Sequence, residues 1–86
     1  MCANIVERAA IAGSGKAGSG WIRLDSAHVS YDHPLHADFD HALNIDFVND
    51  AGGFGDRLAV ELSLDAAEEL ARAILAATAR ARQYEA

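Results

Sequence analysis

At residues 57–75 the chain reads RLAVELSLDAAEELARAIL, and the spacing of its apolar residues changes halfway. Over residues 57–62 apolar and polar side chains alternate, which predicts a β-strand with one face turned to a core. Ser63 is a favourable N-cap, and apolar residues recur after it at helical spacing: Ala67, Leu70, Ala71, Ile74 and Leu75. The sequence therefore predicts a strand that passes directly into a helix over residues 64–83.

Three segments upstream also have the composition of strands, at residues 3–11, 21–31 and 41–49. They are separated by a glycine-rich loop over 13–20 and an irregular polar connection over 32–40, and a turn over 50–56 follows the last of them. The apolar residues of 21–31 switch from even to odd positions near Ser26, which predicts a bulge or bend there. Short connections favour antiparallel neighbours.

The expected fold is α+β, a four-stranded antiparallel meander sheet with one C-terminal helix packed on one face. It forms a single domain over residues 1–86. Hydrophobic types make up 51% of the chain, but nineteen of these residues are alanine. Because few large apolar side chains remain, the core is small and a second subunit is expected to cover more of the surface. We therefore expect a homodimer, with Trp21 or Phe39 in its exposed apolar patch.

The net charge of −6 excludes two classes of partner. A chain without a basic stripe cannot make the phosphate contacts of a nucleic-acid-binding protein, and a polybasic attachment to a membrane surface fails for the same reason. The N-terminus has no basic leader and no apolar stretch spans a bilayer, so we expect a cytoplasmic protein. Cys2 is the only cysteine, which excludes a disulfide within the chain.

The glycine-rich loop contains the pattern G-x-G-x-x-G at Gly13, Gly15 and Gly18. This spacing binds a dinucleotide only where the loop leads directly into a helix. Here a predicted strand follows at Trp21, so a hairpin connection is the better interpretation.

The charged residues are unevenly distributed, because residues 24–56 contain seven aspartates, all four histidines and no Lys or Arg. His33 and His36 form an H-x-x-H pair, His41 follows them, and His28 lies in the strand before them. Imidazole and carboxylate groups suit divalent zinc, iron, copper or manganese. We therefore expect His33, His36 and His41 to bind a divalent transition metal, with His28 or Cys2 as further ligands.

Other interpretations of these residues stay open. The histidines could be hydrogen-bonding anchors of a solvated loop, or could perform acid–base chemistry with a carboxylate from another strand. Cys2 is either a small apolar residue of the first strand or, after removal of Met1, a nucleophile or soft metal ligand. Cys2 and His33 are the candidate catalytic residues of a metal-free enzyme.

Three blocks of the sequence read MCANIVE at residues 1–7, VSYDHP at 29–34 and HALNIDFVN at 41–49. With these blocks the chain resembles a family of short bacterial proteins that is catalogued as a domain of unknown function. The resemblance spans most of the chain and implies a bacterial origin and a free-standing domain. It implies no reaction, cofactor or partner.

Three functional hypotheses follow from the residues. The first is a small metal-binding protein, which stores or senses the metal or uses it in catalysis. The second is a non-catalytic dimeric interaction or accessory module without metal. The third is a small metal-free enzyme that uses Cys2 and a histidine. A small-molecule ligand is compatible with each of them.

Overall fold

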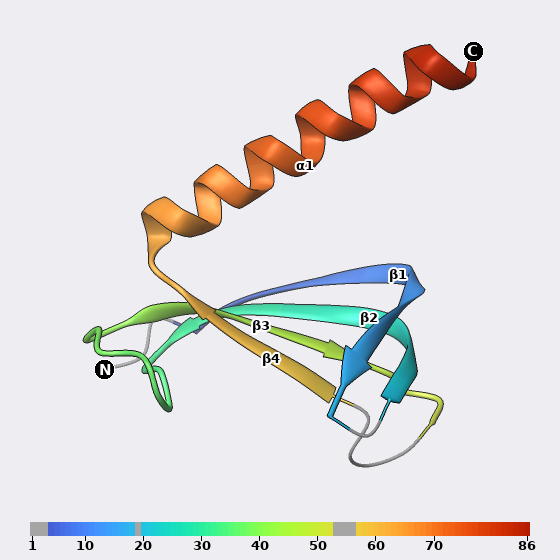
Figure 1. Ribbon diagram of the computed structural model, residues 1–86. Helices are drawn as coiled ribbons and strands as arrows, with labels where there is room; N and C mark the ends of the chain where they lie inside the picture. The colour runs from blue at the N-terminus through green and yellow to red at the C-terminus, as the bar shows by residue number, and fades with distance from the viewer. Residues whose placement is uncertain (1–3, 19, 53–56) are drawn as a thin grey trace.

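The computed structural model describes residues 4–18, 20–52 and 57–86. Its elements follow in the order β1 (Ile5–Ala17), β2 (Gly20–Asp32), β3 (Ala42–Val48), β4 (Arg57–Leu62) and α1 (Leu64–Glu85). The strands form one antiparallel sheet in the order β1-β2-β3-β4, and α1 lies over one side of it (Figure 1). The predicted α+β meander with one C-terminal helix is confirmed.

The glycine-rich segment differs from its prediction. β1 continues to Ala17 and β2 begins at Gly20, so the hairpin is confirmed but residues 13–17 belong to a strand and not to a loop. Glycine can adopt the extended backbone conformation of a strand, and pairing with residues 20–24 holds the segment in the sheet. At the turn itself Gly20 has a φ of +131°, which a residue with a side chain rarely adopts.

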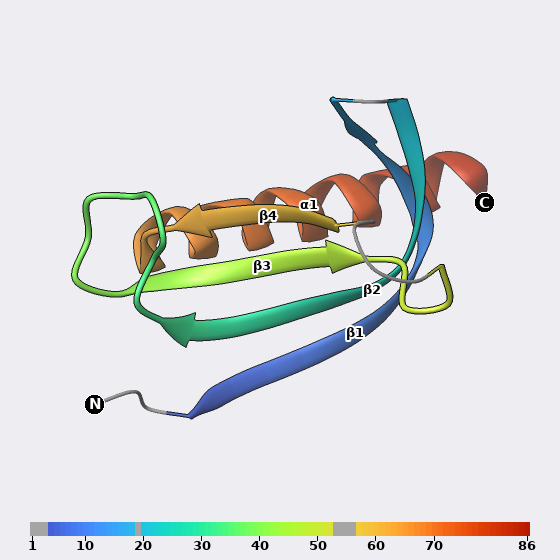
Figure 2. The ribbon, with the colours of Figure 1, turned by 90° about the horizontal axis from the view of Figure 1, so that it is seen from below.

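β1 and β2 change register halfway along their hairpin. Ala10 pairs with Ser26 but Gly13 pairs with Leu24, so β1 holds one residue more than β2 between these pairs. The bulge predicted near Ser26 is confirmed, and its extra residue belongs to β1. A bulge bends and twists a strand pair, and beyond this point the hairpin turns towards the β4 side of the sheet (Figure 2).

The pleat divides the sheet into an apolar face and a polar face. The apolar face is turned to α1, because its Leu43 lines a groove with Ala67 and Ala71 of the helix. It consists of alternate side chains of β2, β3 and β4: Val29, Tyr31, Leu43, Ile45, Phe47, Leu58, Val60 and Leu62. All of these side chains are half-buried. The apolar face is therefore only partly covered by the described part of the chain.

The core is correspondingly small. In the described residues no large side chain is fully buried, and the buried apolar residues are Leu24, Ala27 and Ala42. Phe47, which the strand pattern places in a core, is half-buried. Trp21 is 69% exposed and Phe39 is 46% exposed, so both stand at the surface of the single chain.

α1 begins directly after β4 because Ser63 caps it. The Ser63 hydroxyl accepts the backbone N–H of Ala66 at 3.1 Å, as the N-cap prediction requires. The helix meets the sheet near its start, where Ala67 and Ala71 line an apolar groove with Leu43. Figure 1 shows α1 leaving the sheet at an angle beyond this groove.

Most of the helix surface is open to solvent. No residue of α1 is buried against the described part of the chain, and on its apolar stripe Leu70 is 43%, Ile74 56% and Leu75 70% exposed. In the described residues no helix is long and apolar enough to cross a membrane.

Candidate functional site

The polar face is the side of the sheet opposite α1. It is formed by alternate side chains of all four strands, namely Arg8, Ser26, His28, Ser30, Asn44, Asp46, Arg57 and Glu61. Cross-strand pairing sets these residues in rows, because side chains opposite one another in an antiparallel pair lie close together. The polar face therefore gathers the hydrogen-bonding and charged groups of strands that are far apart in sequence.

Glu61 anchors the loop of residues 33–40 to the polar face. Its carboxylate accepts the backbone N–H groups of three consecutive residues, Leu35 at 2.5 Å, His36 at 3.1 Å and Ala37 at 2.7 Å. These bonds stabilise the charged form, so they hold the pKa of Glu61 below its usual value, and the N–H of Ala37 contributes most.

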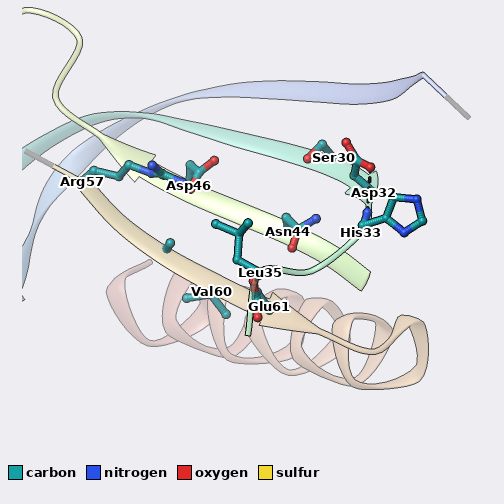
Figure 3. A pocket seen from close by; sticks show the side chains of 10 residues that line it. Ser30, Asp32, His33, Leu35, Asn44, Asp46, Arg57, Val60 and Glu61 are labelled. Carbon is teal, nitrogen blue, oxygen red and sulfur yellow. Dashed lines mark hydrogen bonds and ion pairs between the residues drawn. The ribbon is translucent and has the colours of Figure 1, made fainter. Parts of the chain in front are cut away.

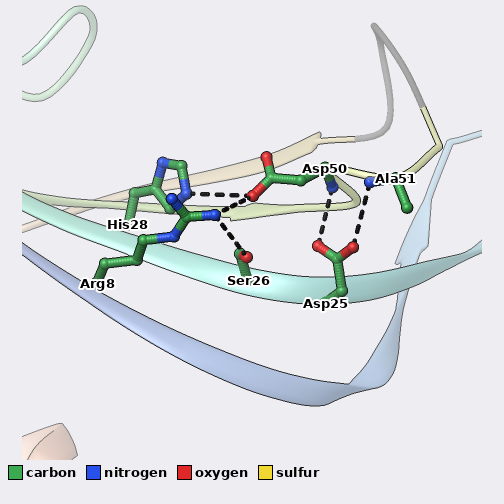
Figure 4. A network of polar contacts seen from close by, with 6 residues as sticks. All are labelled: Arg8, Asp25, Ser26, His28, Asp50 and Ala51. Atoms are coloured by element: carbon green, nitrogen blue, oxygen red, sulfur yellow. Dashed lines mark hydrogen bonds and ion pairs between the residues drawn. The ribbon is translucent and has the colours of Figure 1, made fainter.

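Asp25 anchors the opposite end of the sheet in the same way. Its carboxylate accepts the backbone N–H of Asp50 at 2.8 Å and that of Ala51 at 3.2 Å (Figure 4). The hydrogen bond from Asp50 is the main reason why the pKa of Asp25 lies below its usual value. Asp25 thereby fixes the start of the turn that follows β3, and the turn carries Asp50 to the polar face.

Arg8, His28 and Asp50 meet at this end. Arg8 Nη2 lies 2.6 Å from Asp50 Oδ2, and His28 Nε2 lies 3.7 Å from the same oxygen (Figure 4). Within the described residues the shielded Nε2 of His28 has no hydrogen-bond partner. Because 3.7 Å is too long for a hydrogen bond, Asp50 does not orient the imidazole as a catalytic carboxylate would.

An open pocket of about 180 Å³ lies on the polar face beside the loop anchored by Glu61 (Figure 3). It is lined by Ser30 and Asn44, whose side chains form no hydrogen bond with other described residues. Asp46 and Arg57 line it as an ion pair, with Arg57 Nη2 2.9 Å from Asp46 Oδ1. The pocket offers both donors and acceptors to a small polar molecule.

Two of the four histidines come together at the end of the sheet. The rings of His33 and His41 stack with their centroids 4.5 Å apart, and His41 also stacks on Tyr31 at 5.2 Å. His33 Nδ1 lies 3.0 Å from the carbonyl oxygen of Asp40. His33 is therefore a hydrogen-bonding anchor of its loop, which is one of the interpretations that the sequence left open.

The two other candidate histidines, His28 and His36, do not join this pair. His28 lies near Asp50 on the polar face, and the exposed His36 donates its backbone N–H to Glu61. Cys2 lies outside the described residues, so its predicted roles as ligand and nucleophile stay predictions.

Across residues 4–18, 20–52 and 57–86, no group of three or more His, Cys, Asp or Glu side chains is arranged to hold a metal ion. The planes of the stacked His33 and His41 rings differ by 30°. Because the lone pair of an imidazole nitrogen lies in the ring plane, stacked rings do not direct their lone pairs at one ion. Metal binding by this segment stays a prediction.

The sequence points to residues 28–41 but not to the contribution of β3 and β4. Asn44, Asp46, Arg57 and Glu61 line the pocket, whereas their sequence pattern predicts only outward-facing strand positions. Their signal is the alternation itself, because polar residues at alternate positions of neighbouring strands share one face. The sequence pattern does not reveal the register of the strands, which sets these residues opposite one another.

In a comparison with protein-family models, residues 1–86 match a model with the description "Family of unknown function (DUF6295)". This supports the resemblance to a family of unknown function, while the bacterial origin stays a prediction. No curated protein and no solved structure matches the chain.

Proposed function

The chain belongs to this family of unknown function, and from its surfaces we propose that it is a non-catalytic homodimeric interaction module. The dimer contact is formed by α1 and the apolar face of the sheet. One observation carries the proposal, namely that a 22-residue helix with an apolar stripe has no buried residue within the described chain.

A helix of this kind needs a partner surface. Helices of globular proteins owe most of their stability to the packing of an apolar face, and isolated helices are marginal in water. Each Leu or Ile that is fully buried contributes about 1.5–3 kcal/mol. In the single chain much of that contribution is not realised by Leu70, Ile74 and Leu75, because they are 43–70% exposed.

A second copy is the occupant that the surface favours. The apolar face and the helix stripe form two walls of one open apolar wedge, joined at the groove between Leu43 and Ala67. Two identical wedges can fill each other about a two-fold axis, which is the common geometry of homodimers. The polar face stays outside such a contact, so its pocket remains accessible to a small-molecule ligand.

The test is the molar mass of the untagged protein over a dilution series, by size-exclusion chromatography with light scattering. We expect twice the chain mass of 9.1 kDa at high concentration, with and without chelator. Ile74→Glu places a charge on the stripe and shifts the protein to monomer, whereas Ala76→Glu on the opposite side of α1 leaves the dimer intact.

Circular dichroism and dispersed amide signals in an NMR spectrum distinguish a folded monomer from an unfolded variant. A wild-type protein that is monomeric and folded at several hundred micromolar would refute the proposal. A dimer that persists in folded Ile74→Glu would show that α1 is not part of the contact.

A second candidate function is metal binding, and the proximity of His33 and His41 favours it. Two imidazoles 4.5 Å apart could converge on an ion after rotation of one ring, with Cys2, His36 or His28 as the further ligands that the sequence predicts. Elemental analysis of untagged protein is the test. Metal that is retained unchanged by the double variant His33→Ala and His41→Ala would exclude this pair as ligands.

A further inference from the structure

The charges of α1 are separated along its length. Asp65, Glu68 and Glu69 lie in the first two turns, and Arg72 lies in the middle. The last two turns hold Arg80, Arg82 and one acidic residue, Glu85. The acidic residues favour the N-terminal end of the helix dipole and the basic ones the C-terminal end. The acidic start of the helix is thereby complementary to Arg80 and Arg82 near the end of a second copy.

Three residues set the geometry of this complementarity. Glu68, Leu75 and Arg82 follow one another at intervals of seven residues. At about 100° per residue, a seven-residue step returns almost to the same side of a helix. Glu68, Leu75 and Arg82 therefore lie on one line along α1, at the edge of the apolar stripe, with Leu75 at its centre.

We infer that two copies of the chain pair through α1 in antiparallel orientation, with Leu75 at the two-fold axis and Glu68 beside Arg82 of the partner subunit. A two-fold axis perpendicular to both helices sets the line on one helix against the same line on the partner helix, with the two lines running in opposite directions. The central Leu75 then meets its own copy, and each end of the line meets the oppositely charged end. The inference rests on the proposed function and specifies its interface.

The size of α1 also allows such a contact. The large side chains Leu70, Ile74 and Leu75 of the stripe lie near the middle of the helix, so a contact centred on Leu75 covers them. The helix is about 33 Å long, so it can contribute much of the surface that a stable dimer buries, about 800 Å² per subunit.

The start of α1 also suits the basic end of the partner. The apolar groove beside Leu43 is rimmed by Asp65 and Glu68. In the antiparallel pair this acidic rim lies near the last turns of the partner helix, where the two arginines Arg80 and Arg82 outnumber the single acidic residue Glu85. In a parallel pair the line of Glu68 would face the other edge of the stripe, where Leu70, Ala73 and Ala77 offer no charge.

Disulfide trapping tests the orientation directly, in a Cys2→Ser background. Leu75→Cys is expected to form a covalent dimer under mild oxidation. Glu68→Cys alone is expected to remain monomeric on a non-reducing gel, but to cross-link when mixed with Arg82→Cys. Ala76→Cys, on the opposite side of the helix, is the matched control and stays uncross-linked.

Charge reversal tests the pairing between Glu68 and Arg82. Glu68→Arg and Arg82→Glu each place like charges together twice in the dimer, and each is expected to weaken the dimer about tenfold. The double variant restores opposite charges and recovers most of the loss. The dissociation constants come from sedimentation equilibrium at low salt.

The outcomes separate this inference from the proposed function. A dimer that cross-links through Glu68→Cys alone, or that is unaffected by both single reversals, overturns the antiparallel arrangement while the homodimer stands. A wild-type protein that remains monomeric overturns both.

Discussion

The carboxylate of Glu61 holds one end of the polar face together, because three consecutive backbone N–H groups of the loop 33–40 point at it. Asp25 does the same for the turn that begins at Asp50. Each carboxylate accepts hydrogen bonds from backbone N–H groups that are not paired within a strand or helix. A hydrogen bond to a charged acceptor is stronger than one to a neutral acceptor. Single acidic residues therefore position both loops, and the loop held by Glu61 borders the candidate pocket.

Replacing Glu61 with glutamine is expected to loosen the loop 33–40. The amide keeps one acceptor oxygen and loses the charge, so the N–H groups of Leu35, His36 and Ala37 are held less strongly. Their hydrogen exchange should accelerate roughly three- to tenfold. Glu7→Gln, on the exposed strand β1, is the control and should leave these amides unchanged.

The contribution of Glu61 should also depend on pH. Its pKa is lowered in the folded chain, so its stabilisation is complete above the ordinary glutamate pKa and disappears as the pH falls through the lowered value. The difference in unfolding free energy between wild type and Glu61→Gln should therefore be largest near pH 7 and vanish in acid. Urea unfolding at several pH values measures it, and a difference that grows in acid would contradict the assignment.

At the scale of the elements, the β1–β2 hairpin is longer than its glycines suggest, and its far half bends around the bulge between Ala10 and Gly13. The bend brings Gly15 against Leu58 at the start of β4. A side chain at this point would occupy the space of the leucine. The glycine at position 15 thus allows close packing between two elements.

Gly15→Val should destabilise the protein, because its Cβ would overlap Leu58 Cδ1 and lie 3.0 Å from Leu24 Cδ1. Overpacking of this kind typically costs about 1–3 kcal/mol. Gly13→Val is the matched control in the same strand, since a Cβ there meets no atom of the described chain within 4 Å. Urea unfolding compares the two variants, and equal stabilities would refute the packing argument.

At the scale of the whole molecule, the two sides of the sheet differ in how far the chain itself satisfies and covers their side chains. The polar side is bordered by two anchored loops, and its ion pairs are satisfied within the chain. The apolar side has a half-buried sheet face below a helix that leaves it. The expected homodimer completes the apolar side, because the described chain leaves most of the helix stripe in water.

The thermal stability should therefore depend on concentration. If folding and dimerisation are coupled, each tenfold dilution lowers the stability by about 1.4 kcal/mol per dimer. For a dimer of this size the melting temperature should fall by about 3–6 °C per tenfold dilution. Differential scanning fluorimetry over two decades of concentration measures this, and a folded Ile74→Glu monomer should show no such dependence.

Local patterns predicted the elements well. The change of apolar spacing at Ser63 marks the junction of β4 and α1, and the parity change near Ser26 marks the bulge. Both signals are local, because spacing and capping act within a few residues. The glycine-rich segment was predicted wrongly as a loop, since the pairing that keeps residues 13–17 in a strand comes from β2 and not from the segment itself.

The sequence alone specifies the order of strands and helix, the apolar stripe of α1 and the acidic, histidine-bearing segment, because each is a matter of composition or short-range periodicity. The tertiary structure adds the contacts between distant residues. It places Glu61 under the loop of His36, stacks His33 on His41, and sets His28 near Asp50. These contacts depend on strand register and on the path of two loops, and a shift of one residue in register would turn each strand side chain to the other face.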